Sequence, residues 1–294
     1  MYYEINIDKE LAQAEIAFRY YLNQSVQLRN ATDIPEQLKY YYRGMLAPTG
    51  SAALSFRALF FAMRLQPVLN YIQHSEHPPR VLDLGCGFGL QTLLLSQSGA
   101  QVYGIDTAVD EIDEAQRQKI VYEQEYGASL NLDYEAANLF DFHANEPFDA
   151  VYSSATLHHI EPAGKAIQAI ADLIKPSGWF FLSDENGYSP VQQLIVQKRI
   201  GWTSSRHVIR TDPATGKIYP YGRENIRAPF QWARHMRRAG LEPRFIKYCR
   251  LLPPVNWPLE RLVRGERALR NIPLVAQIAA IGFLLAAQKS SADD

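Results

Sequence analysis

Short apolar runs alternate with longer, more polar stretches through the middle of the chain, from residue 80 to about residue 185. The longer stretches, which follow Gly89, Val109 and Pro162, predict helices. The apolar runs predict strands at residues 81–84, 101–105, 130–136, 150–153 and 179–183. Because strands that alternate with helices build βαβ units, we expect a parallel sheet with helices on both faces.

Residues 1–75 have a helical pattern and precede this alternation. Neither proline nor glycine interrupts residues 8–27, a second helix is predicted after Pro35, and a third is predicted over residues 51–73. The third helix carries an apolar face at helical spacing, formed by Phe61, Leu65, Val68 and Ile72. We expect residues 1–75 to act as a lid or substrate segment, next to a domain over residues 76–294.

The C-terminal part has a different pattern. A helix over residues 229–239 is predicted to end at Gly240, and strands are predicted at residues 244–249 and 282–289. No helix signal lies between Gly282 and the end of that last strand, so we expect it to run antiparallel.

The longest apolar run covers residues 272–287 and contains Gln277. At 16 residues it is shorter than the ~20 that a membrane-spanning helix needs. We therefore expect this run to be buried core, and we expect no transmembrane segment.

Charge and cysteine content narrow the function classes. The formal net charge is −1, so no basic field indicates a nucleic-acid partner. Two cysteines, Cys86 and Cys249, are too few for a disulfide framework and favour a reducing compartment. The polar first residues, MYYEINIDKE, do not resemble a signal peptide. We expect a cytoplasmic protein.

Three glycines, Gly85, Gly87 and Gly89, lie in the predicted turn between the first strand and the helix after it. Glycine permits positive φ and close approach of a ligand, and ligands of open α/β sheets bind at the carboxyl ends of the strands. The spacing is G-x-G-x-G rather than the G-x-G-x-x-G of dinucleotide sites.

Two carboxylates indicate which ligand this turn accepts. Asp83 precedes the glycines, where it would repel a pyrophosphate and attract an ammonium group. Asp106 ends the second strand, 21 residues after Gly85, where an acidic side chain accepts hydrogen bonds from ribose hydroxyls. Together they predict an adenosyl amino acid that carries a sulfonium.

At these motifs the chain resembles the class I S-adenosylmethionine-dependent methyltransferases of the small-molecule branch (types 11 and 25). The resemblance covers residues 78–185 and implies a Rossmann-like, seven-stranded, mostly parallel sheet whose last strand is antiparallel. It is carried by VLDLGCGFG (residues 81–89), VYGID (102–106), AANLF (136–140), FDAVYSSATLHHI (148–160) and LIKPSGWFFLSDE (173–185). It implies S-adenosylmethionine as cofactor, S-adenosylhomocysteine as product, and a small organic acceptor.

The resemblance also implies roles for single residues. Asp83, Gly85 and Ser154 would flank the methionine part, and Gly87 and Gly89 would keep the turn tight. Asp106 would bind the ribose diol, and the residues implied near the adenine are Thr107, Asn138 and Leu139. Asn138 replaces the family's usual aspartate, which keeps an acceptor oxygen but removes the charge.

Candidates for catalysis follow the fourth and fifth strands. His159 is favoured slightly over His158 as a base, because an unperturbed histidine titrates near neutral pH. Either histidine alternatively holds the loop, and Glu185 is the next candidate. No cluster of cysteine and histidine has ligand spacing, so we expect no metal.

Two insertions, residues 187–228 and 251–280, and the N-terminal segment are expected to surround the acceptor. Their candidate substrate-binding residues are Tyr41, Tyr188 and Tyr219. The first insertion contains turn signals for a hairpin, and the second is predicted to be helical. Four arginines recur every third residue in the second insertion, a spacing compatible with weak contact to a membrane surface or with a solvated helix face: Arg261, Arg264, Arg267 and Arg270.

Two other functions remain open at this point. One is a nucleic-acid or protein methyltransferase, although SSATLHHI (residues 153–160) replaces the Pro-Pro-aromatic motif that base methylation commonly uses. The other is a non-catalytic module that binds S-adenosylmethionine, since a fold alone does not prove an activity.

Overall fold

The structure is a computed structural model of the 294-residue chain. It describes residues 7–31, 39, 52–200, 207–211, 218–253, 255 and 257–291. Tyr41, one of the expected substrate-binding residues, lies outside these ranges.

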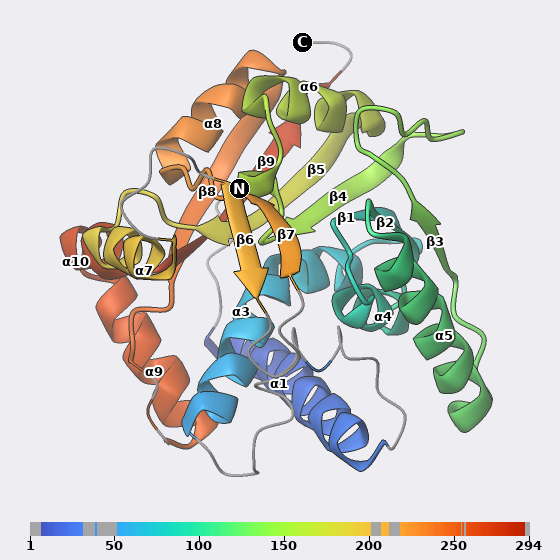
Figure 1. The fold of residues 1–294 in the computed structure, drawn as a ribbon, viewed down its shortest axis with the longest axis horizontal. Coiled ribbons are helices and arrows are strands. Elements are labelled where there is room, and N and C mark those ends of the chain that lie inside the picture. The colour runs from blue at the N-terminus through green and yellow to red at the C-terminus, as the bar shows by residue number, and fades with distance from the viewer. Residues whose placement is uncertain are drawn as a thin grey trace.

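A seven-stranded sheet forms the centre of the molecule (Figure 1), in the order β3-β2-β1-β4-β5-β9-β8. The strand bounds are β1 (Arg80–Leu84), β2 (Gln101–Asp106), β3 (Leu132–Ala136), β4 (Phe148–Ser154), β5 (Ile174–Glu185), β8 (Leu241–Cys249) and β9 (Gly282–Lys289). The pairs from β3 to β5 are parallel, and β9 is antiparallel to both β5 and β8. The expected Rossmann-like sheet with an antiparallel last strand is confirmed.

Both faces of the sheet are buried because successive side chains of each strand point to opposite faces. On β1, Val81 packs into the core on one face and Leu82 into the core on the other, and Ala150 and Val151 on β4 alternate in the same way. Figure 1 shows these faces covered by helices on either side. The helices are α4 (Leu90–Gln97), α5 (Val109–Tyr126), α6 (Ala163–Leu173) and α8 (Pro229–Arg238).

The N-terminal segment shares a core with the sheet. Helix α1 (Ile7–Asn30) packs on α3 (Ala52–Gln73). Leu65 and Val68 of α3 are fully buried, in the same cluster as Val81 of β1. The packed side of α3 is the apolar face that the spacing predicts, so this helix is an integral wall of the domain.

Both insertions have the predicted kind of structure. Residues 187–228 contain α7 (Pro190–Ile200) and an antiparallel pair of strands, β6 (His207–Thr211) and β7 (Ile218–Arg223). Residues 251–280 contain α9 (Leu259–Arg270) and α10 (Pro273–Ala279).

The expectation of a continuous buried run over residues 272–287 is wrong for its first half. Strand β9 is buried, but Leu274 of α10 is 68% exposed and Ile272 before it is 50% exposed. The reason is that α10 turns only Ala276 inward, toward its neighbours α7 and α9. None of the helices in the described ranges has the length and apolarity that crossing a bilayer requires.

Candidate active site

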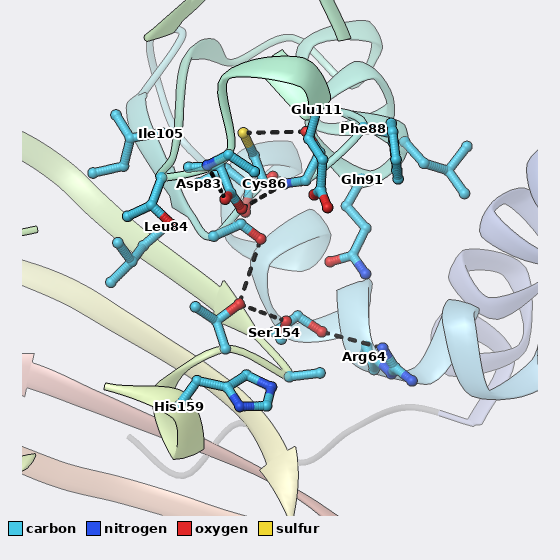
Figure 2. A pocket seen from close by; sticks show the side chains of 18 of the residues that line it. Arg64, Asp83, Leu84, Cys86, Phe88, Gln91, Ile105, Glu111, Ser154 and His159 are labelled. Atoms are coloured by element: carbon cyan, nitrogen blue, oxygen red, sulfur yellow. Dashed lines mark hydrogen bonds between the residues drawn. The ribbon is translucent and has the colours of Figure 1, made fainter. Parts of the chain in front are cut away.

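A cavity of about 1040 Å³ lies at the carboxyl ends of β1, β2 and β4. The glycine turn and the end of β2 line one part of it, and helix α3 lines another. Figure 2 shows side chains from these elements pointing toward one space, with Ser154 between the turn and Arg64 and with His159 below it. This is the position at which open α/β sheets bind their ligands.

The glycine turn has a backbone that other residues rarely adopt. Gly85 and Gly89 have φ of 76° and 77°. A Cβ on Gly85 would collide with the side chain of Thr156, and one on Gly89 would collide with Tyr134. Both positions therefore require glycine for conformation and for space.

Asp106 joins the end of β2 to this turn. Its carboxylate accepts hydrogen bonds from the backbone N–H groups of Gly87, at 3.0 Å, and Ala108, at 3.1 Å. A carboxylate offers about four acceptor sites, so Asp106 retains capacity for two more donors. Thr107 lines the cavity beside it.

Two further carboxyl groups lie near the turn. Asp83 is 2% exposed, and its Oδ2 accepts a hydrogen bond of 2.7 Å from the Thr92 hydroxyl. Burial raises the pKa of Asp83 to about 7, against the opposing effect of that hydrogen bond. Burial and the charges of Asp106 and Asp110 raise the pKa of Glu111 to about 8.

Glu111 is a cavity residue that sequence reasoning missed. It stands in the first turn of α5, where an acidic residue is ordinary because it complements the helix dipole. Only the packing of α5 beside the turn brings it to the site, close enough that a Cβ on Gly87 would lie 3.1 Å from its carboxylate oxygen.

Two of the three residues expected near adenine lie together after β3, whereas Thr107 follows β2. Asn138 and Leu139 both line the cavity, and Leu139 is buried. Asn138 Oδ1 accepts a hydrogen bond of 2.9 Å from the Phe140 backbone N–H, which fixes the loop. The amide nitrogen of Asn138 and one lone pair of Oδ1 remain for a ligand.

The two adjacent histidines have different surroundings. His158 is 3% exposed, and its Nδ1 lies 2.5 Å from Asp184 Oδ1. Burial by itself lowers the pKa of His158, but the charge and hydrogen bond of Asp184 outweigh it and raise the pKa to about 8. His159 lines the cavity and is labelled in Figure 2. The geometry therefore separates a buried, ion-paired histidine from one that faces the site.

Two other expected residues, Glu185 and Tyr188, are not brought to the cavity. Glu185 accepts a hydrogen bond of 2.6 Å from Gln192 of α7. Tyr188 is 52% exposed, with its ring edge against Phe230. The cause is that the chain turns away from the sheet edge after β5. There the Asn186 side-chain amide donates hydrogen bonds to the backbone carbonyls of Gln277, in α10, and of Ala280, directly after α10. Tyr219 belongs to β7, of which only the backbone is described.

Helix α3, in the N-terminal segment that was expected to surround the acceptor, contributes wall residues that sequence reasoning did not name. Phe56, Phe60 and Arg64 line the cavity, as does Arg57. Phe56, Phe60 and Arg64 recur every four residues, a signal for a common helix face that lies next to the apolar face already identified. Phe61 of that apolar face also lines the cavity. Arg250, directly after β8, completes this wall, and nothing in the sequence near it indicates that position.

Ser154 connects the two walls. It ends β4, and its hydroxyl oxygen lies 3.5 Å from Arg64 Nη1 (Figure 2). Across the described residues, no three His, Cys, Asp or Glu side chains are grouped so as to hold a metal ion.

A family model described as a methyltransferase domain matches residues 56–244. The chain belongs to this methyltransferase family. The match begins within α3 and ends in β8, so it includes the glycine turn and most of the wall that α3 provides. The resemblance noted from the motifs is confirmed.

Curated relatives match part of this methyltransferase. The ubiquinone biosynthesis O-methyltransferase of Burkholderia thailandensis is 37% identical over 127 residues, 42% of this chain and 52% of that protein. The trans-aconitate 2-methyltransferase of Pseudomonas aeruginosa is 32% identical over 123 residues, 40% of this chain and 41% of that protein. The chain spans about half the length, or less, of these relatives.

Solved structures agree on the fold. Magnesium protoporphyrin IX methyltransferase from Synechocystis PCC 6803, solved with bound SAH, superposes with a TM-score of 0.57 and 17% identity. The superposition covers 87% of this chain and 95% of that one. At this identity the likeness establishes a shared fold.

The residues at the glycine turn fit S-adenosylmethionine, the methyl donor of this family. Burial is the main cause that raises the pKa values of the Asp83 and Glu111 carboxyl groups, and neighbouring acidic residues raise both further. The charge of a lysine or arginine opposes neither shift. A donor with an ammonium and a sulfonium supplies the positive charge that these groups favour. Asp106 has the capacity to accept from a diol.

Proposed function

We propose that the protein transfers a methyl group from S-adenosylmethionine to a small organic acceptor, at oxygen, nitrogen or carbon. The observation that carries this proposal is one cavity of about 1040 Å³ whose turn is acidic and whose opposite wall is aromatic and basic. A cavity of that size is at the upper end of the range for single ligands, so it has room for a donor and an acceptor together.

We assign the donor to the acidic part. Asp106 binds the ribose diol, and Asp83 and Glu111 favour the cationic methionine end by charge. Leu139 packs on the adenine, with Thr107 and Asn138 beside it. The turn of Gly85, Gly87 and Gly89 allows the backbone to approach the donor, and Ser154 borders its methionine part. Eight of the nine implied residues line the cavity, all but Gly89, which supports this assignment. Asp83 and Leu139 are in addition buried.

When bound, S-adenosylmethionine supplies an electrophilic methyl group on a sulfonium. The chain's own contribution is to orient the acceptor for in-line displacement and to exclude water. His159 is the residue that we assign to accept a proton from a hydroxyl or similar acceptor, because it lines the cavity at the end of β4. His158 positions this loop through its pair with Asp184.

Calorimetry with S-adenosylhomocysteine tests the donor assignment. We expect micromolar binding by the folded protein, and a strong loss in Asp106→Asn. Asp113→Asn removes an exposed carboxylate of α5 and is the matched control, with unchanged binding. Failure of the folded wild-type protein to bind at high micromolar concentration would falsify the proposal.

A small-molecule acceptor is favoured over nucleic acid or protein by the names of the relatives. Those names refer to ubiquinone biosynthesis, trans-aconitate and magnesium protoporphyrin IX. Transfer of labelled methyl to metabolite extract, but not to RNA, DNA or added protein, is the expected result. Donor binding without any turnover would instead indicate a non-catalytic module.

We infer a cytoplasmic location from thiol chemistry. Cys86 and Cys249 are both buried and free, as expected for a reducing compartment. Cell fractionation with an antibody against the chain tests the inference, and recovery from an oxidising compartment contradicts it.

We infer in addition a weak contact with anionic membrane surfaces through α9 and α10. Arg261 and Arg264 are exposed on α9, and Leu274 is exposed on the neighbouring α10. Basic side chains next to apolar ones suit the headgroup region. Co-sedimentation with phosphatidylserine vesicles, but not with phosphatidylcholine vesicles, is expected, and the double variant Arg261→Glu, Arg264→Glu abolishes it. Equal recovery with both vesicles contradicts the inference.

A further inference from the structure

Three arginines line the same wall of the cavity. Arg57 and Arg64 belong to α3, and Arg250 follows β8. Arg57 and Arg64 are seven residues apart on one helix, which separates their Cα atoms by roughly 10 Å along its axis. The wall therefore presents positive charge over a length that exceeds one small anion.

Two of these guanidinium groups share an aromatic ring. The Arg64 Cζ lies 4.0 Å from the centroid of Phe60, and the Arg250 Cζ lies 4.7 Å from the same centroid. Arg250 also lies 5.7 Å from the ring of Phe56. Burial, and then the charge of Arg64, lower the pKa of Arg250. Two cations this close repel each other unless an anion joins them.

No carboxylate in the described part of the chain forms an ion pair with any of the three arginines. The Nε atoms of Arg64 and Arg250 are buried and have no hydrogen-bond acceptor. Glu185 acts on Arg250 only through its charge, at a distance, and its carboxylate accepts from Gln192 instead. The acidic turn does not compensate these charges either, because no arginine lowers the pKa of Asp83 or Glu111.

The methyl donor has a single carboxylate, and one arginine suffices for it. Arg64 reaches Ser154, which we have placed beside the methionine part of the donor. Arg64 is therefore the partner of the donor carboxylate. Arg250 and Arg57 then remain on the wall without an assigned anion. A guanidinium is best satisfied by the two oxygens of a carboxylate or phosphate.

We propose that the methyl acceptor carries an oxyanion, a carboxylate or a phosphate, which Arg250 binds with the support of Arg57, while its apolar body packs on Phe56 and Phe60. This proposal rests on the proposed function and adds the acceptor's chemical class to it. The order along the cavity is then acidic turn, donor, methyl group, acceptor, and the part of the wall formed by Arg57 and Arg250. His159 lies beside the acceptor in this order and is the group available for its proton.

The experiment measures binding to protein that is already saturated with S-adenosylhomocysteine. The probes are benzoate, 4-hydroxybenzoate and phenyl phosphate, each compared with the neutral 4-hydroxybenzamide. We expect the best anionic probe to bind at least about tenfold more tightly than the amide. Comparison of phenyl phosphate with the carboxylates tells which oxyanion the wall prefers.

Variants assign the preference to a residue. Arg250→Gln should remove the preference for anions and leave the affinity for S-adenosylhomocysteine within about twofold, and Arg250→Lys should restore it in part because it keeps charge without the bidentate geometry. Arg64→Gln should weaken S-adenosylhomocysteine binding. Arg238→Gln, an exposed arginine of α8, is the matched control and should change neither. Melting curves verify that each variant is folded.

Two outcomes overturn the proposal while the proposed function stands. One is equal binding, or no binding, of anionic and neutral probes by protein that holds S-adenosylhomocysteine. The other is a loss of donor affinity in Arg250→Gln as large as that in Arg64→Gln, which would assign both arginines to the donor. Loss of S-adenosylhomocysteine binding by the wild-type protein is a different result and contradicts the proposed function itself.

Discussion

The acidic turn and the arginine wall face one cavity but are assembled in different ways. Asp83 and Asp106 come from the ends of neighbouring parallel strands, within a short stretch of sequence. Arg64 and Arg250 come from places almost two hundred residues apart, a helix before the sheet and the loop after β8. We assign the donor mainly to the first kind of construction, with Arg64 reaching it from the wall, and we propose that the rest of the wall selects the acceptor.

The largest expected effect falls between the two regions, at His159. Replacing it with alanine removes the base that we assign and should lower the rate of labelled methyl transfer by about 10²–10⁴-fold. Affinity for S-adenosylhomocysteine should remain unchanged, because the imidazole is not assigned to the donor. His158→Ala is the comparison, and it should chiefly lower the melting temperature because it leaves Asp184 buried and unpaired. Equal transfer rates in His159→Ala and wild type would remove the catalytic assignment.

On the acidic side, Asp106→Ala should weaken S-adenosylhomocysteine binding by roughly 10–100-fold. The substitution removes the acceptor of the Gly87 and Ala108 N–H groups as well as the assigned partner of the ribose. Hydrogen bonds to charged groups contribute about 1.5–3 kcal/mol. Calorimetry measures the loss, and Arg250→Gln in the same assay should show none. If both variants lose donor affinity equally, the two regions are not functionally separate.

Asp83→Asn should change binding and stability in opposite directions. Burial raises the pKa of Asp83 from 3.8 to about 7, so the folded state favours the protonated form. The stability due to this proton is complete below pH 3.8 and is lost as the pH rises through about 7. At pH 8, Asn should therefore raise the free energy of unfolding of the donor-free protein by a few kcal/mol, ~4 at most. Donor affinity should fall, because the negative charge is gone.

Urea unfolding at pH 6 and pH 8 checks this sign. Wild type should lose stability over that interval, from Asp83 and Glu111 and also from His158, whose raised pKa of about 8 gives the same direction. Asp83→Asn should remove only the contribution of Asp83, so its decline should be smaller but present. A decline as steep as that of wild type would show that Asp83 ionises freely in the fold.

The smallest effect is expected at Asn138. Its alanine variant should bind S-adenosylhomocysteine about two- to tenfold more weakly, the loss of one neutral hydrogen bond and of the cap on the Phe140 N–H. Asn138→Asp keeps the acceptor oxygen and should retain the cap. Calorimetry separates the two variants, and identical weakening in both would assign the effect to the amide nitrogen.

The sheet and the acidic turn were predictable because their signals are local. Strand periodicity and the G-x-G-x-G turn can both be recognised from consecutive residues. The carboxyl ends of β1 and β2 then lie side by side because these strands pair in parallel. The turn's close approaches, such as Tyr134 against Gly89, follow from packing and were not predictable, yet they only reinforce the same glycines.

The remainder depends on tertiary structure. The order His158-His159 does not say which ring enters the cavity, because the burial of His158 depends on Asp184 and Glu224, far along the chain. The apolar residues before β9 could be assigned to core by hydrophobicity alone, but Leu274 is exposed because α10 packs through small residues. Arg250 belongs to no recognisable sequence motif. It contacts Phe60 only because the end of β8 lies beside α3 in the folded structure.

One face of helix α3 packs in the core, and the face next to it lines the cavity. Leu65 and Val68 are fixed by the core, while Phe60 and Arg64 face the cavity one turn or less away. Phe60 also packs on a core cluster that includes Phe56 and Cys249, so substitutions at these aromatic positions disturb packing. Arg57 is exposed, so it can be exchanged without removing a residue of the core. Acceptor preference can therefore be altered at such a position of α3, by design or by natural variation, while the packed residues hold the helix in place.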